Sequence, residues 1–106
     1  MNITLRQLRA FVTLARSPSF NEASELLHLS QSALSVAIKK MEQEVGGSLF
    51  SRSTRSLELS PEGRNFLPTA QRLLADWDEA FDDLGRSFSL QQGKISVAVM
   101  PSFAMN

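Results

Sequence analysis

The 106-residue sequence contains no cysteine and a single histidine, His28. Without cysteine it has no disulfide framework, no thiolate zinc site and no cysteine nucleophile. One histidine without neighbouring acidic or sulfur ligands makes a poor metal site, so we expect neither a metal nor a cofactor. No apolar run approaches the length of a membrane span, and Arg6 and Arg9 interrupt the first apolar residues, which does not fit a signal peptide. These absences predict a cytoplasmic protein.

The sequence also lacks a surplus of either charge, with 11 basic and 11 acidic side chains. That balance argues weakly against nucleic-acid binding, for which a basic surplus is typical. The distribution weakens the objection, because residues 1–60 hold seven Lys/Arg against five Asp/Glu, whereas residues 61–106 hold four against six. Six of these seven basic residues cluster at three places: Arg6 and Arg9, Lys39 and Lys40, and Arg52 and Arg55. A local basic patch can bind phosphate in a neutral chain.

Capping patterns predict where the first two helices begin. Thr4 and Gln7 form a capping box ahead of an apolar stripe of helical spacing, and Pro18 ends that first helix. Ser19 and Glu22 form a second capping box, which opens a short helix.

The third predicted helix, over residues 30–45, has two unlike faces. Ser30 is its expected N-cap, and Gly46 or Gly47 supplies a left-handed C-cap. At about 100° per residue, one face gathers the apolar residues Leu34, Ile38, Met41 and Val45. The opposite face carries Ser32, Ser35, Val36, Lys39 and Gln43. Small side chains there let the backbone approach a partner such as the base edges of a major groove, while a plain solvated helix is the alternative of equal weight.

A hairpin and a long helix are expected next. Leu49-Phe50 and Leu57-Glu58-Leu59 are strand candidates around a polar tip, residues 51–56, that holds Arg52, Thr54 and Arg55. Ser60 as N-cap and Pro61 at the first helical position then open a fourth helix that should reach Ser87.

The apolar residues of this fourth helix repeat at spacings of three and four, close to a coiled-coil seam. Such a surface predicts pairing with a second copy. The predicted dimer interface consists of Phe66, Ala70, Leu73, Trp77, Ala80, Phe81, Leu84 and Phe88. Pro68 lies inside the helix and predicts a kink. Further on, residues 95–99 alternate like a strand without a partner, so we expect the chain to be cut from a longer protein.

The predicted elements follow the order of a winged helix-turn-helix: a helix, a short helix, a two-faced helix and a basic hairpin. The chain resembles the N-terminal part of LysR-type transcriptional regulators. The matching stretches are LRAFV at 8–12, SFNEASELL at 19–27, LSQSALS at 29–35, IKKME at 38–42, LFSR at 49–52 and LSPEG at 59–63. These stretches follow one another in unbroken order within a resemblance that covers about residues 3–88, which makes it highly specific.

The resemblance implies a mainly α fold with three parts. These are a winged helix-turn-helix DNA-binding domain over residues 1–60, a linker and dimerisation helix over 61–90, and a hinge with the start of a truncated effector-binding domain over 91–106. It implies a dimeric, usually tetrameric, regulator that binds an inverted repeat in double-stranded DNA, with a small-molecule effector only in the full-length protein. An enzyme is not expected, because the sequence shows no nucleophile–base pair, metal cluster or glycine-rich phosphate loop.

The same resemblance, with the third helix, indicates the DNA contacts. Val36 stands where the family often has an arginine, so it offers only apolar contact, for example to a thymine methyl group. Lys39 should meet a phosphate, and Arg6 matches a phosphate-contacting position. The predicted DNA-binding residues are Arg6, Gln31, Ser32, Ser35, Val36, Lys39, Arg52, Thr54 and Arg55.

A different class of function stays open at this point: a helical dimerisation module without a DNA role, which the seam of the fourth helix alone supports. The small-residue face of the third helix and the arginines of the hairpin argue against it.

Overall fold

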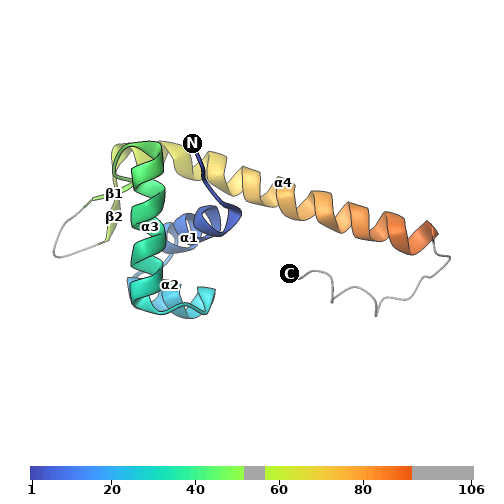
Figure 1. Cartoon of the computed structure of the whole chain (residues 1–106), viewed down its shortest axis with the longest axis horizontal. Helices are drawn as coiled ribbons and strands as arrows, with labels where there is room; N and C mark the ends of the chain where they lie inside the picture. The colour runs from blue at the N-terminus through green and yellow to red at the C-terminus, as the bar shows by residue number, and fades with distance from the viewer. Residues whose placement is uncertain (52–56, 92–106) are drawn as a thin grey trace. The chain divides into compact units, whose positions relative to one another are not determined.

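A computed structural model of the chain describes residues 1–51 and 57–91. The described part is mainly helical, in the order α1 (Leu5–Ala15), α2 (Phe20–Leu27), α3 (Gln31–Val45), β1 (Phe50–Ser51), β2 (Glu58–Leu59) and α4 (Pro61–Gln91) (Figure 1). This is the order of the predicted winged helix-turn-helix followed by a long helix. The chain divides into two compact units, Met1–Leu74 and a second unit that begins at Ala75. None of the described helices is long and apolar enough to cross a membrane. The strand predicted at 95–99 lies outside the described residues.

Helices α1 and α2 begin where the capping residues predict. The Thr4 hydroxyl oxygen accepts from the Gln7 N–H at 3.1 Å, and the Gln7 side-chain oxygen accepts from the Thr4 N–H at 2.9 Å, which confirms the first capping box. At α2, the Ser19 hydroxyl oxygen accepts from the Glu22 N–H at 3.2 Å and so supplies the N-cap half of the second box. Each cap satisfies a backbone donor that the helix itself leaves unpaired.

Helix α3 begins and ends as predicted, but its buried side differs at the C-terminal end. The Ser30 hydroxyl oxygen accepts from the Ala33 N–H at 3.0 Å, and Gly46 ends the helix with a φ of 90°. Val45 was expected on the buried face, but it is 37% exposed, whereas Glu42 is only 7% exposed. The predicted buried face is wrong at this end of the helix. Helical periodicity counts only apolar side chains as buried, although the fold can also bury a charged side chain when it supplies hydrogen-bond partners.

The partners of Glu42 are the backbone groups that lead into the hairpin. One carboxylate oxygen accepts from the Leu49 N–H at 2.8 Å and from the Phe50 N–H at 3.3 Å. A buried carboxylate is tolerable when it receives such bonds, since it satisfies donors that would otherwise be buried without partners. Glu42 therefore ties the end of α3 to the start of β1.

Ser60 joins the hairpin to α4. Its N–H donates to the Leu49 carbonyl at 2.9 Å, its hydroxyl donates to the Ser48 carbonyl at 2.8 Å, and the same oxygen accepts from the Gly63 N–H at 2.9 Å. The last of these bonds confirms Ser60 as the predicted N-cap of α4. The two short strands pair antiparallel, with Phe50 opposite Leu59.

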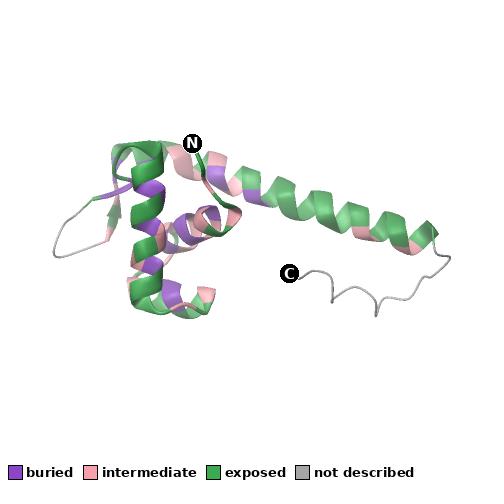
Figure 2. Ribbon diagram, viewed as in Figure 1, coloured by how far each residue is buried: buried purple, intermediate pink, exposed green. Residues whose placement is uncertain are grey.

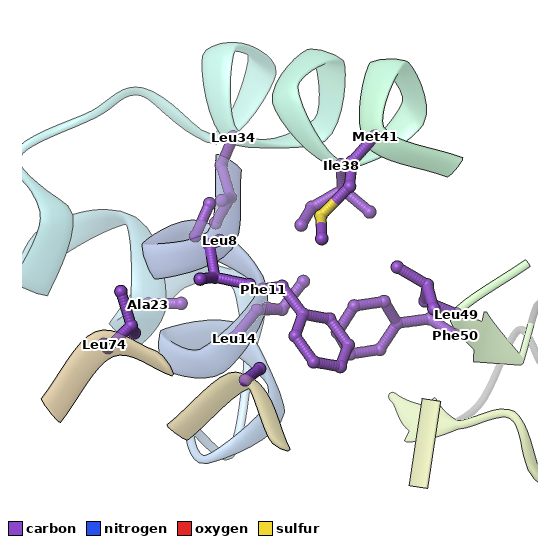
Figure 3. Packing of buried hydrophobic residues seen from close by; sticks show 12 residues of the cluster. Leu8, Phe11, Leu14, Ala23, Leu34, Ile38, Met41, Leu49, Phe50 and Leu74 are labelled. Atoms are coloured by element: carbon purple, nitrogen blue, oxygen red, sulfur yellow. The ribbon is translucent and has the colours of Figure 1, made fainter. Parts of the chain in front are cut away.

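The core of the first unit surrounds α1 (Figure 3). Phe11 is fully buried, and its ring centroid lies 5.6 Å from that of Phe50 on β1 and 5.5 Å from that of Phe66 on α4. Leu34 and Met41 bring the inner face of α3 to the same cluster. Figure 2 shows this division on α3, where buried positions alternate with exposed ones along the helix.

The first turns of α4 belong to this core, which narrows the predicted dimer interface. Ala70 is fully buried, and Phe66 is partly buried against the cluster. Both were predicted in the interface, but Ala70 has no exposed surface, whereas Phe66 keeps part of its surface exposed and stays a predicted interface residue. Spacing alone cannot tell which apolar stripe of α4 faces the core and which faces a second copy. Helix α4 continues through Pro68 and past the expected end at Ser87 to Gln91.

Candidate nucleic-acid interface

The outward face of α3 carries the residues that were singled out from the sequence. Gln31, Ser32 and Lys39 are exposed, Ser35 is partly exposed, and Val36 is 51% exposed. The opposite face, through Leu34, Ile38 and Met41, is buried in the core. The packing of the helix thus presents the small and polar side chains of its first two turns together on one side.

The chemistry of this face changes along the helix. Its first turn offers hydroxyl and amide groups, its middle offers the two methyl groups of Val36, and the cation Lys39 follows. Hydroxyl, amide and apolar groups match what base edges present in a major groove, and a lysine matches a phosphate. The N-terminal end of a helix also favours an anion.

The turn between α2 and α3 is short and tightly bonded. His28 adopts a left-handed conformation with a φ of 58°, and the Leu29 N–H donates to the Ser24 carbonyl at 2.9 Å. Ser24 is buried, and its hydroxyl donates to the Asn21 carbonyl at 2.8 Å. Backbone bonds from His28 and Leu29 therefore tie the turn before α3 to the last residues of α2.

One contact on this face escaped sequence reasoning. The Gln31 side-chain amide donates to the Asn21 side-chain oxygen at 3.1 Å, which links the first residue of α3 to the second residue of α2. Both side chains are exposed. The two residues are ten positions apart, so no helical periodicity pairs them. Only the placement of α2 beside α3 could have indicated the bond.

Four other predicted contact residues are placed differently or not at all. Arg6 is exposed in the first turn of α1, and so lies on a different helix from the contact residues of α3. Arg52, Thr54 and Arg55 lie outside the described residues. Among the residues that the structure does describe, no group of three or more His, Cys, Asp or Glu is placed to hold a metal ion.

The second unit carries an apolar stripe on α4. Trp77, Phe81, Leu84 and Phe88 are exposed to 47%, 55%, 47% and 54% respectively. Their spacings of four, three and four residues are those of alternating core positions in a coiled coil. The rings of Trp77 and Phe81 contact each other with centroids 5.1 Å apart. Ala80 is exposed beside them, and Leu73, which lies in the first unit, is half exposed.

Comparison with known proteins gives a consistent match. Residues 5–64 fit the model of a family described as "Bacterial regulatory helix-turn-helix protein, lysR family". The HTH-type transcriptional regulator YbhD of Escherichia coli strain K12 is 37% identical over 102 residues, which are 96% of this chain and 32% of YbhD. CfxR, an HTH-type transcriptional regulator of Cupriavidus necator, is 40% identical over 98 residues, 92% of this chain and 31% of CfxR. The chain thus spans about a third of the length of these relatives.

Solved structures resemble the fold as well. The BenM_DBD complex with benA site 1 DNA has 35% sequence identity and a TM-score of 0.77, and the match covers 81% of this chain and 97% of that one. DarR of Vibrio fischeri, also in complex with DNA, has 31% identity and a TM-score of 0.79 over 85% of this chain and 31% of that one.

Proposed function

Because the chain belongs to the lysR family of bacterial regulatory helix-turn-helix proteins, we propose that it binds double-stranded DNA as a transcription regulator. The observation that carries the proposal is the outward face of α3, on which small, amide, apolar and cationic side chains succeed one another with the opposite face locked in the core. The DNA present in the BenM_DBD and DarR structures supports it, since both resemble this fold at more than 30% identity.

In the proposed complex α3 lies in a major groove. Ser32 and Ser35 are short enough to let the helix approach the base edges, and Gln31 reaches a base with its amide. Val36 contributes apolar contact, and Lys39 neutralises a phosphate, which makes affinity fall as salt rises.

Further contacts are proposed from the sequence alone. We propose that Arg52, Thr54 and Arg55 of the wing approach the adjacent backbone or minor groove, where an arginine senses groove width more than sequence. Arg6 would meet a phosphate near the start of α1.

Two copies are proposed to pair through α4. The exposed stripe of Trp77, Ala80, Phe81, Leu84 and Phe88 supports this, because a solvent-facing seam with coiled-coil spacing is unfavourable without a partner. Leu73 extends the same spacing. A two-fold dimer would place two α3 helices on an inverted repeat with half-sites about one or two helical turns apart.

The relatives YbhD and CfxR are about three times as long as this chain. We propose that, in full-length proteins of this family, the part beyond the matched residues senses a small-molecule effector and allows dimers to assemble into tetramers. A bacterial protein that acts on chromosomal DNA works in the cytoplasm, which is the compartment we propose.

The second candidate, a dimerisation module without a DNA role, is favoured by the α4 stripe alone. That candidate does not explain why small, amide, apolar and cationic side chains gather on the exposed face of α3. The two candidates differ in one observable, which is whether the chain prefers some duplex sequences over others.

Selection of bound duplexes from a random pool at low salt tests the proposal. We expect enrichment of an inverted repeat whose half-site spacing is fixed. A flat profile, with a dimer still present by sedimentation, would leave the dimerisation module as the better description.

A further inference from the structure

The hydrogen bond between Asn21 and Gln31 joins two side chains whose backbones are both fixed by helix caps. Helix α2 is fixed at its start by the Ser19 cap, and the Ser24 hydroxyl donates to the Asn21 carbonyl. Helix α3 is fixed at its start by the Ser30 cap. The two amide side chains therefore project from anchored backbone, and the 3.1 Å bond between them restricts the rotamers of Gln31 before any partner arrives.

The direction of the bond decides which hydrogen-bonding groups Gln31 has left. A primary amide has two N–H donors and one carbonyl acceptor. Gln31 gives one donor to the Asn21 oxygen, and within the described part of the chain this is the bond its side chain makes. One donor and one acceptor remain to face a partner.

That remaining pair matches one base in the major groove. Adenine presents an acceptor, N7, beside a donor, the N6 amino group, so a glutamine with one donor and its acceptor satisfies both. Guanine presents two acceptors, N7 and O6, which together would need two donors. The bond to Asn21 removes the second donor and so disfavours guanine.

We propose that Asn21 is a positioning residue that orients Gln31 to hydrogen-bond the edge of an adenine. This inference rests on the proposed function, since it requires α3 to face a major groove. Asn21 acts through Gln31 and sets the base preference at one position of the site, because it both restricts the side chain and occupies one of its donors.

The expected size of the effect follows from the cost of ordering a flexible side chain. Immobilising one such side chain on binding costs about 0.5–1.5 kcal/mol, which corresponds to about a two- to tenfold change in affinity. Loss of Asn21 should therefore reduce the preference for adenine over guanine at that position by about two- to tenfold, while preferences at other positions stay the same.

Binding of the wild-type chain and its variants to a selected duplex, with each base in turn at every position, tests the inference. Gln31→Ala identifies the position that Gln31 reads. Asn21→Leu, of similar size but without an acceptor, should narrow the adenine preference there. Asn21→Asp keeps an oxygen that accepts from Gln31, so it should retain the preference although overall affinity falls. Glu25→Ala, an exposed change elsewhere on α2, is the matched control and should leave the profile unchanged.

Several outcomes would overturn the inference. An unchanged adenine preference in Asn21→Leu would do so, and so would a loss spread evenly over all positions, which indicates a structural role. Equal narrowing in Asn21→Asp and Asn21→Leu would show that the acceptor oxygen is not what matters. If Asn21→Leu does not fold, Asn21→Ala, which also lacks an acceptor, takes its place beside Asn21→Asp. Absence of any base preference in the wild-type chain would instead contradict the proposed function itself.

Discussion

The buried carboxylate of Glu42 accepts a hydrogen bond from the backbone N–H of Leu49 at 2.8 Å. This bond connects the last turn of α3 to the chain that enters β1, and the same oxygen also accepts from Phe50. The helix proposed to face DNA and the hairpin that follows it are thus joined by a charged group inside the first unit. Its removal would leave backbone donors buried without partners.

Replacing Glu42 with leucine should destabilise the first unit. Two buried N–H groups would lose their acceptor, at about 1–3 kcal/mol each, so we expect the free energy of unfolding to fall by about 2–6 kcal/mol. Glu42→Gln, which keeps one carbonyl oxygen, should lose less. Chemical denaturation at fixed protein concentration measures the change. Glu44→Leu, on the exposed side of the same helix, is the control, because the Asn2 N–H that loses its acceptor there is exposed and can bond to water instead. Equal stability of Glu42→Leu and Glu44→Leu would contradict the structural role given to Glu42.

Gly63 and Gly85 should respond in opposite ways to the same substitution. A Cβ at Gly63 would lie 2.2 Å from the Leu49 carbonyl oxygen, whereas a Cβ at Gly85 meets nothing within 4 Å. Gly63→Ala must therefore push α4 away from the hairpin and should cost about 1–3 kcal/mol or more. Gly85→Ala removes a flexible residue from a helix interior and should stabilise α4 by about 0.5–1 kcal/mol. Thermal unfolding followed by circular dichroism measures the stability of both variants. A Gly63→Ala protein that is more stable than the wild type would contradict the packing of α4 against the hairpin.

Phe81→Glu should dissociate the proposed dimer. In a two-fold interface the change occurs twice, so two phenylalanine side chains are no longer buried and the free energy of dimerisation weakens by about 3–6 kcal/mol. The dissociation constant should therefore rise at least about a hundredfold. Sedimentation over a range of concentrations measures it. Glu79→Gln is the matched control, because Glu79 lies about 200° around the helix from Trp77. A Phe81→Glu variant that remains dimeric at the wild-type concentration would exclude this stripe as the interface.

Val36 should contribute contact with a thymine methyl group. Removing one buried methyl costs about 0.8 kcal/mol, so replacing the contacted thymine with deoxyuridine should weaken wild-type binding about fourfold. Val36→Ala should bind the thymine site more weakly and respond little to that replacement. Titration of the four protein–duplex combinations measures the coupling between the two groups. If the valine and alanine proteins respond equally to deoxyuridine at every thymine of the site, the proposed contact does not exist.

The helix starts were predictable because their causes are local. Thr4, Ser19 and Ser30 each bond to a backbone N–H three residues later, so a short window of sequence holds both partners. Gly46 likewise ends α3 in a conformation that glycine adopts at no steric cost.

The errors have non-local causes. Val45 was expected on the buried face, but Glu42 is buried at this end of α3 instead, because its carboxylate accepts from Leu49 of the following segment. Ala70 was expected in the dimer interface but is fully buried, because the spacing of α4 does not encode how its first turns pack on the core. On the candidate site, the sequence indicated the exposed face of α3, but the partner of Gln31 depends on how α2 packs beside it.

The affinity of the chain for its selected duplex, before and after a charge is placed on the α3 face, tests the central claim most directly. Ser35→Glu puts a carboxylate where base edges and phosphates lie in the proposed complex. Because like charges at an interface cost several kcal/mol, binding should weaken at least about a hundredfold. Ala75→Glu adds the same charge to an exposed position of α4 away from the apolar stripe and should leave affinity nearly unchanged. A Ser35→Glu protein that stays folded and dimeric and binds the duplex as tightly as the wild type would contradict the assignment of α3 as the DNA-reading helix.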